Sequence, residues 1–140
     1  INSGATTLWE TWKYPDNAGS QNHPMFGSTE EWFYRTVLGI NPSLNGFSTV
    51  ILKPQPVPQL SWAKGHYESV HGKIEVSWSV SGRQYKLEVA IPGNTRAEVY
   101  VKSATNEPVF VNGERTSAAR YENGFAIVDL SSGRYKIQST

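Results

Sequence analysis

The sequence of 140 residues contains no cysteine, a single methionine and only three histidines. The absence of cysteine excludes disulfide bonds and thiolate metal sites, and it carries no information about the cellular compartment. His23, His66 and His71 are too few and too scattered to form a zinc site from protein ligands alone. No metal or other cofactor is therefore expected.

The sequence also lacks an excess of charge and a long apolar run. Thirteen basic and twelve acidic side chains leave a formal net charge of only +1, without the basic stripe that nucleic-acid binders carry. No run approaches the roughly 18 apolar residues of a membrane-spanning helix. We therefore expect neither a nucleic-acid partner nor a membrane partner. On length alone the chain is one ordinary domain.

Aromatic residues are abundant by comparison. The chain has five tryptophans, seven tyrosines and five phenylalanines. Large rings of this kind suit either a packed β core or a sugar-binding surface, and composition does not choose between the two. The first 40 residues hold three of the tryptophans, at positions 9, 12 and 32.

From Pro42 onward the hydrophobic pattern has a period of two. In the segment 73–80, for example, apolar and polar residues alternate strictly, and the next alternating segment follows a Ser-Gly-Arg turn. Evenly spaced strands with turn dipeptides such as Asn-Gly between them indicate an antiparallel β-sandwich or barrel. The predicted strands are 48–53, 73–80, 85–91, 97–101, 108–111, 119–121, 125–130 and 135–138.

The first 40 residues instead carry a helical pattern after a loop at 13–21. Ser28 and Glu31 are spaced as a capping box, and Pro42 follows as a stop signal. This arm is too short to close a core alone, so it either packs on the β part or belongs to a helical domain whose remainder lies elsewhere. Its abundant apolar surface favours the second alternative. The apolar residues predicted on one helical face are Phe26, Phe33, Val37 and Ile40.

Glu10 is the leading candidate for chemistry, because it stands close to the two indoles of Trp9 and Trp12. Indole walls exclude water, tend to raise a carboxyl pKa and offer flat faces to a sugar ring. Such a carboxylate suits a general acid or base in glycoside chemistry. The structural alternative is a partly exposed glutamate between two core tryptophans.

Two further residue sets have both a functional and a structural interpretation. His23, just before Pro24, is placed either to donate a hydrogen bond to a ligand hydroxyl or to cap a helix. Trp62 and Trp78 are candidates for a carbohydrate platform, although Trp78 lies in an alternating apolar set and fits a core position better.

Several motifs, in order along nearly the whole chain, resemble the C-terminal end of bacterial α-L-rhamnosidases of glycoside hydrolase family 78. The first is Ala-Thr-Thr-Leu-Trp-Glu, which ends at Glu10, and the second is Asn-His-Pro-Met-Phe-Gly, which contains His23. The segments that carry the resemblance are 5–10, 22–27, 31–35, 39–42, 60–69, 72–74, 87–95 and 111–113.

The resemblance implies a fold and a domain organisation. Members of this family have an (α/α)6-barrel catalytic domain followed by an antiparallel β-sandwich. Residues 1–40 would then be the C-terminal end of the helical barrel, and residues 41–140 the C-terminal sandwich domain. The expected fold is mainly β, an antiparallel β-sandwich preceded by a short α-helical arm left over from the barrel. Ile1 would lie inside a longer protein.

The resemblance also implies site residues. These enzymes release terminal α-L-rhamnose with inversion, and Glu10 falls on the family's general base. His23 falls on a histidine that contacts the sugar, while Trp9 and Trp12 are expected to wall the pocket or to pack. The general acid lies upstream and has no match here, so the chain alone is expected to be inactive. Its expected partners are a rhamnose-containing glycan or glycoside and the upstream barrel domain.

Two alternatives come from other functional classes. A carbohydrate-binding β-sandwich module predicts exposed, coplanar rings on one sandwich face, with Trp62 among them. A purely structural interaction domain predicts that the N-terminal arm docks and that the chain self-associates through its exposed aromatic residues.

Overall fold

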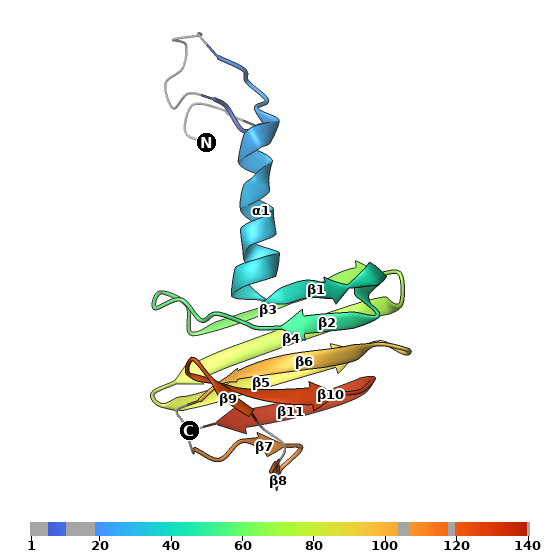
Figure 1. Ribbon diagram of the computed structural model, residues 1–140. Coiled ribbons are helices and arrows are strands. Elements are labelled where there is room, and N and C mark those ends of the chain that lie inside the picture. Colours follow the sequence, from blue (N-terminus) through green and yellow to red (C-terminus); the bar gives the residue numbers. More distant parts are fainter. Residues whose placement is uncertain (1–5, 11–18, 104–106, 118–119, 140) are drawn as a thin grey trace. The chain divides into compact units, whose positions relative to one another are not determined.

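The computed structural model describes residues 6–10, 19–103, 107–117 and 120–139 (Figure 1). The chain divides into two compact units, residues 1–32 and residues 33–140. The first unit contains a 3-10 turn, η1 (Pro24–Ser28), and one turn of α-helix, α1 (Thr29–Trp32). The second begins with a short π-helical segment, η2 (Phe33–Val37). In the described part of the chain, no helix is long and apolar enough to cross a membrane.

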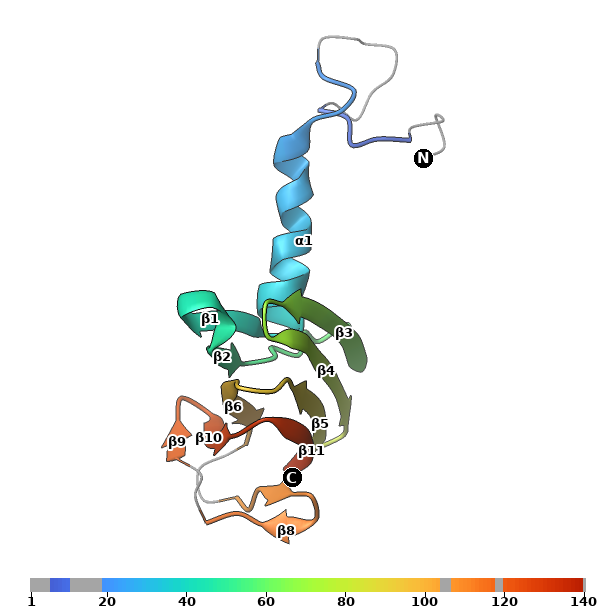
Figure 2. The ribbon, with the colours of Figure 1, turned by 90° about the vertical axis from the view of Figure 1, so that its right-hand side faces the viewer.

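The second unit is a sandwich of two sheets, whose two layers are seen edge-on in Figure 2. A 3-10 turn, η3 (Asn45–Phe47), joins the first two strands. Strands β2 and β6 run parallel, and the remaining described pairs are antiparallel. One sheet has the order β1 (Ile40–Leu44), β2 (Thr49–Leu52), β6 (Arg96–Lys102), β10 (Phe125–Leu130), β9 (Arg120–Glu122). The other has the order β3 (Trp62–Ser69), β4 (Gly72–Ser81), β5 (Gln84–Ile91), β11 (Gly133–Ser139), β7 (Phe110–Val111), β8 (Glu114–Arg115).

The core lies between the two sheets and is built by the period-two alternation of the sequence. Along residues 74–78 of β4 and 85–89 of β5 every second side chain is buried, as predicted from the apolar residues of these segments. Burying each Val, Leu or Ile side chain stabilises the fold by about 1.5–3 kcal/mol relative to leaving it in water. The prediction of a β-sandwich preceded by a short helical arm is confirmed. The largest fully buried side chains are Trp78, Leu52, Ile74, Leu87 and Ile137.

Trp78 connects the sheet to the chain segment that enters it. Its side chain is only 1% exposed, and its indole Nε1 donates a 2.7 Å hydrogen bond to the carbonyl oxygen of Val37. That carbonyl lies at the end of η2, where a helix leaves acceptors unpaired. The core position of Trp78 is therefore confirmed, and the ring takes no part in a carbohydrate platform.

The prediction that Ile40 continues a helical face was wrong, because Ile40 is the first residue of β1. The helical segment ends at Val37, and Gly39 follows with a φ of 71°. A side chain on Gly39 would place its Cβ 2.1 Å from the carbonyl carbon of Lys53. Only glycine allows this left-handed turn at so close a backbone approach, and the turn directs the chain into the sheet.

Candidate functional site

Two stretches of the first unit, one before and one after residues 11–18, are joined by backbone hydrogen bonds. The amide of Glu10 donates to the carbonyl oxygen of Ser20 over 2.8 Å. The amide of His23 donates to the carbonyl oxygen of Leu8 over 2.7 Å. These two bonds bring the two leading site residues of the sequence prediction into the same small region.

The side chains of Glu10 and His23 approach each other there. Atom Oε2 of Glu10 accepts a 2.8 Å hydrogen bond from the backbone amide of Ser20, and it lies 3.8 Å from Nδ1 of His23. The second distance is too long for a hydrogen bond but short enough for an ion pair when the imidazole is protonated. The Glu10 side chain is 45% exposed and that of His23 is 24% exposed. The carboxylate is thus held at one oxygen and accessible to water.

Gly19 leaves the space that this carboxylate occupies. A Cβ added to Gly19 would lie 2.7 Å from Oε2 of Glu10 and 3.1 Å from its Cβ. The sequence pattern places Gly19 and Ser20 in a loop and does not indicate their part in positioning Glu10. The available signal was a Gly-Ser pair just ahead of the Asn-His motif, because small residues allow the backbone to approach another group closely.

Of the two tryptophans predicted to wall the pocket, only one lies in the described part of the chain. Trp9 is half-buried next to Glu10 in the chain, whereas Trp12 lies outside the described residues. The role of either indole as a pocket wall stays a prediction. The arrangement that is described is a partly exposed carboxylate, a backbone amide on one of its oxygens and an imidazole beside it.

This arrangement suits proton transfer at a polar ligand. An ionised carboxylate offers about four lone-pair positions, so an oxygen that accepts one amide bond keeps the capacity to take a proton from water. An imidazole can donate or accept a hydrogen bond with a sugar hydroxyl. Among the described residues, no cluster of three or more metal-ligating side chains is present.

The two exposed rings of β3 do not form one flat platform. Trp62 is 66% exposed and Tyr67 is also exposed, yet the two stand on opposite faces of β3, because successive side chains alternate along a strand. Tyr67 instead stacks on Phe47 with ring centres 4.8 Å apart, and Tyr34 meets its edge at 6.5 Å. The coplanar rings that the carbohydrate-module alternative requires on one face are thus not provided by Trp62 and Tyr67.

The outer face of the β1–β9 sheet carries a polar cluster. The Oη of Tyr100 donates a 2.6 Å hydrogen bond to Glu98, and Arg120 pairs with Glu98 at 2.9 Å and with Asp129 at 3.0 Å. The hydrogen bond to Glu98, helped by partial burial and the nearby carboxylates, raises the pKa of Tyr100 to about 12. Lys53 lies over the Tyr100 ring, 4.6 Å from its centre. These contacts are explained as packing and charge pairing on a strand surface.

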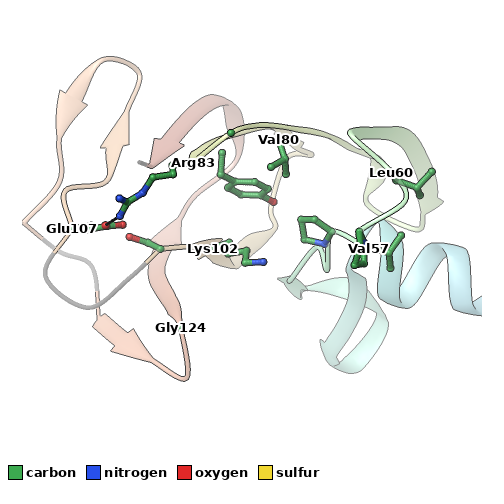
Figure 3. Close-up of a pocket in the computed structure, with 12 residues that line it drawn as sticks. Val57, Leu60, Val80, Arg83, Lys102, Glu107 and Gly124 are labelled. Carbon is green, nitrogen blue, oxygen red and sulfur yellow. Dashed lines mark ion pairs between the residues drawn. The ribbon is translucent and has the colours of Figure 1, made fainter.

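A hollow of about 500 Å³ lies at one end of the sandwich (Figure 3). Residues of the second unit form it, and neither Glu10 nor His23 is among them. It is therefore distinct from the site predicted from the sequence.

Two family models match consecutive parts of the chain. The model of the bacterial α-L-rhamnosidase 6-hairpin glycosidase domain matches residues 1–37. The model of the bacterial α-L-rhamnosidase C-terminal domain matches residues 39–116, which is more than half of the chain. Both descriptions agree with the family named from the motifs.

Curated relatives match most of the chain or nearly all of it. An α-L-rhamnosidase of Streptomyces avermitilis is 31% identical over 144 residues, which cover 97% of this chain and 14% of the relative. An α-L-rhamnosidase of Alteromonas sp. is 35% identical over 126 residues, covering 78% of this chain and 14% of the relative. The chain thus spans about one seventh of the length of these relatives.

Solved structures agree with the sequence relatives. An α-L-rhamnosidase from Dictyoglumus thermophilum superimposes with a TM-score of 0.87 at 29% identity, covering 99% of this chain and 16% of the other. The Streptomyces avermitilis α-L-rhamnosidase complexed with L-rhamnose gives 0.85 at 29% identity, covering 99% of this chain and 14% of the other. The chain belongs to the bacterial α-L-rhamnosidase family of glycoside hydrolases and corresponds to the C-terminal part of its members.

Proposed function

We propose that this chain supplies the general base of an inverting glycoside hydrolase that releases terminal α-L-rhamnose from rhamnosides. Glu10 is the proposed base. The observation that carries the proposal is the position of its carboxylate, 3.8 Å from His23 and held by the amide of Ser20, inside the segment matched by the glycosidase-domain model.

The proposed reaction is a single displacement at the anomeric carbon. Glu10 takes a proton from a water molecule whose oxygen forms the new bond to that carbon. The bond to the leaving oxygen breaks on the opposite face, and this oxygen receives a proton from a second carboxylic acid. Inverting enzymes hold their two carboxyl groups about 6.5–9.5 Å apart, which leaves room for the water.

Each neighbour of Glu10 has a role in this proposal. The amide of Ser20 orients Oε2, and His23 forms a hydrogen bond with a hydroxyl of the sugar. Trp9 and Trp12 line the sugar pocket or pack beside it. The general acid is supplied by the upstream part of the full-length protein, so the 140-residue chain alone does not hydrolyse rhamnosides.

We also propose a domain assignment. Residues 1–40 form the C-terminal end of the helical catalytic domain, and residues 41–140 form the C-terminal sandwich domain. Two observations support a division in this part of the chain, namely the start of β1 at Ile40 and the change of family model between residues 37 and 39. The partners are then the upstream helical domain and a rhamnose-containing glycan or glycoside.

The proposal is tested in the full-length protein with Glu10→Gln. General base catalysis contributes about 10²–10⁴-fold to a rate, so kcat on a rhamnoside is expected to fall by that factor with little change in KM. Glu30→Gln is the matched control, because Glu30 is an exposed carboxylate of the same unit. Proton NMR of the first turnovers should show release of β-L-rhamnose. Release of the α anomer, or a loss of less than about tenfold in Glu10→Gln, would contradict the proposal.

A further inference from the structure

The hollow at the end of the sandwich is formed where several parts of the second unit meet. Gly82 and Arg83 belong to the turn between β4 and β5, Lys102 ends β6, and Gly124 lies in the turn between β9 and β10. The proline-rich connector between β2 and β3 forms the remaining wall. At about 500 Å³ the hollow falls within the size range of small-molecule sites, roughly 300–1,000 Å³.

The walls of this hollow are of two kinds (Figure 3). Val57 and Leu60 lie on one side, Arg83 and Glu107 lie on the opposite side, and Lys102 lies between them. A guanidinium nitrogen of Arg83 is 3.5 Å from a carboxylate oxygen of Glu107, so these two charges balance each other. Lys102 then gives the described lining a net charge of +1. The hollow thus combines an apolar face with one positive charge.

Tyr85 carries a polar atom at this site that has no partner. Its side chain points toward the core at the start of β5 and is only 3% exposed. Its Oη is buried and has no hydrogen-bond partner among the residues that the structure describes. Buried polar atoms nearly always have a hydrogen-bond partner. An unpaired hydroxyl beside a hollow therefore indicates a place where a ligand atom supplies the missing hydrogen bond.

The proline-rich connector that forms one wall of the hollow has few backbone hydrogen bonds between residues 55 and 60. Pro56 and Pro58 have no amide hydrogen to donate to a sheet. In the described chain, the backbone hydrogen bonds of residues 55–60 outside regular strands run from Gln55 to Thr36 and from Leu60 to Val57. Neither bond ties the middle of the connector to β5. A small shift of this wall therefore disrupts no sheet ladder.

We propose that this hollow binds a sugar that carries a carboxylate, such as a uronic acid. The apolar wall packs against the C–H face of the ring, and Lys102 pairs with the carboxylate. Glu107 accepts a hydrogen bond from a sugar hydroxyl, and the Oη of Tyr85 donates one to a sugar oxygen. The inference rests on the proposed function in one respect, because a glycan substrate is what brings saccharides to the protein. It extends that function by naming the class of saccharide that the hollow binds, a glycan that carries a carboxylate.

The test is an NMR titration of the 140-residue chain with sodium D-glucuronate at low salt. D-glucose serves as the sugar without a charge, and sodium propionate as the carboxylate without a sugar. We expect saturable shifts at the amides of Gly82, Arg83 and Ser103. Because the charge and the ring both contribute, glucuronate should bind at least about fivefold more tightly than either control.

Three variants locate the binding. Lys102→Met should weaken glucuronate binding by about fivefold or more. Lys86→Met is its matched control, because Lys86 is an exposed lysine adjacent to Tyr85 on the opposite face of β5, and its affinity should equal that of the parent chain. Tyr85→Phe should lower the affinity while leaving the unfolding midpoint unchanged or higher, since the hydroxyl has no bond to lose.

Each opposite result overturns the inference. The site is excluded if no saturable binding is found or if propionate binds with the same affinity as glucuronate. It is also excluded if Lys86→Met and Lys102→Met weaken glucuronate binding equally. Parent-like affinity in Tyr85→Phe also overturns the inference, because the buried, unpaired hydroxyl is the observation that points to a ligand. Binding is measured without hydrolysis and away from Glu10, so failure here leaves the proposed base untouched. A failure of Glu10→Gln in the full-length protein likewise leaves this binding test intact.

Discussion

The two units of the chain differ in what holds them together. The sandwich buries a continuous apolar core between its sheets, with Trp78 and Leu87 almost completely excluded from water. In the first unit, none of the residues whose burial is described is buried, and the two stretches around Glu10 are joined by backbone hydrogen bonds. Stability therefore resides in one unit and the proposed chemistry in the other. The proposed base therefore lies in the unit whose described residues include no buried one.

The largest effect should come from Trp78→Ala in the sandwich. This change leaves a cavity and removes the hydrogen bond to Val37, so the free energy of unfolding should fall by about 3–5 kcal/mol. Trp62→Ala is the control on an exposed tryptophan, and it should change stability by no more than about 0.5 kcal/mol. Urea unfolding of the chain measures both. Similar losses in the two variants would show that the core is not where the stability lies.

A change in the first unit should lower the catalytic activity and leave the stability of the sandwich unchanged. Gly19→Ala places a methyl group against the Glu10 carboxylate and displaces it, so kcat of the full-length protein should fall by about 10–100-fold. The urea unfolding of the sandwich should not change.

Gly27→Ala is the matched control for that variant, because a Cβ at Gly27 meets nothing within 4 Å. Its kcat should remain that of the parent protein. If both alanine variants reduced kcat equally, the loss would reflect general disturbance of the segment and not displacement of the carboxylate.

The smallest effect concerns two tyrosines of the sandwich at alkaline pH. Glu98 raises the pKa of Tyr100 from 10.0 to about 12, so its contribution to stability is complete below pH 10 and is lost as the pH rises toward 12. Burial raises the pKa of Tyr85 as well. Ultraviolet absorbance of tyrosinate should show late ionisation, and Glu98→Gln should move one tyrosine toward its ordinary range. An unchanged titration curve in Glu98→Gln would contradict the assignment.

Strands with strict alternation were predictable because their pattern is local. The segment 73–80 was expected from its own residues and lies within β4, and the alternating segment 85–91 lies within β5. Each such strand has one face in the core, so its sequence records its environment at every second position.

Strands β1, β3 and β8 were not predicted, and for β3 and β1 the physical reason is clear. Strand β3 has small residues on its inner face, Ala63 and Gly65, and a Cβ at Gly65 would meet Leu38 at 2.5 Å. The apolar volume beneath β3 is thus supplied by another part of the chain. Strand β1 contains Pro42, which is tolerated only because β1 lies at the edge of its sheet.

The candidate site was predictable in part. Glu10 and His23 were named from motifs, whereas their 3.8 Å approach and the positions of Gly19 and Ser20 required the structure. Backbone hydrogen bonds between two stretches that are far apart in the sequence produce no repeating pattern of residue types in either stretch. The roles of Glu10, His23, Trp9 and Trp12 remain predictions for the experiments above.

The sequence by itself determined the family, the β-sandwich and the residues proposed for chemistry, because motifs and alternation are properties of neighbouring residues. Only the tertiary structure decided that β2 pairs in parallel with β6 and that a hollow opens beside Tyr85. Each of these depends on which distant segment lies opposite, and that choice is made by burial of the whole core and not by any local pattern.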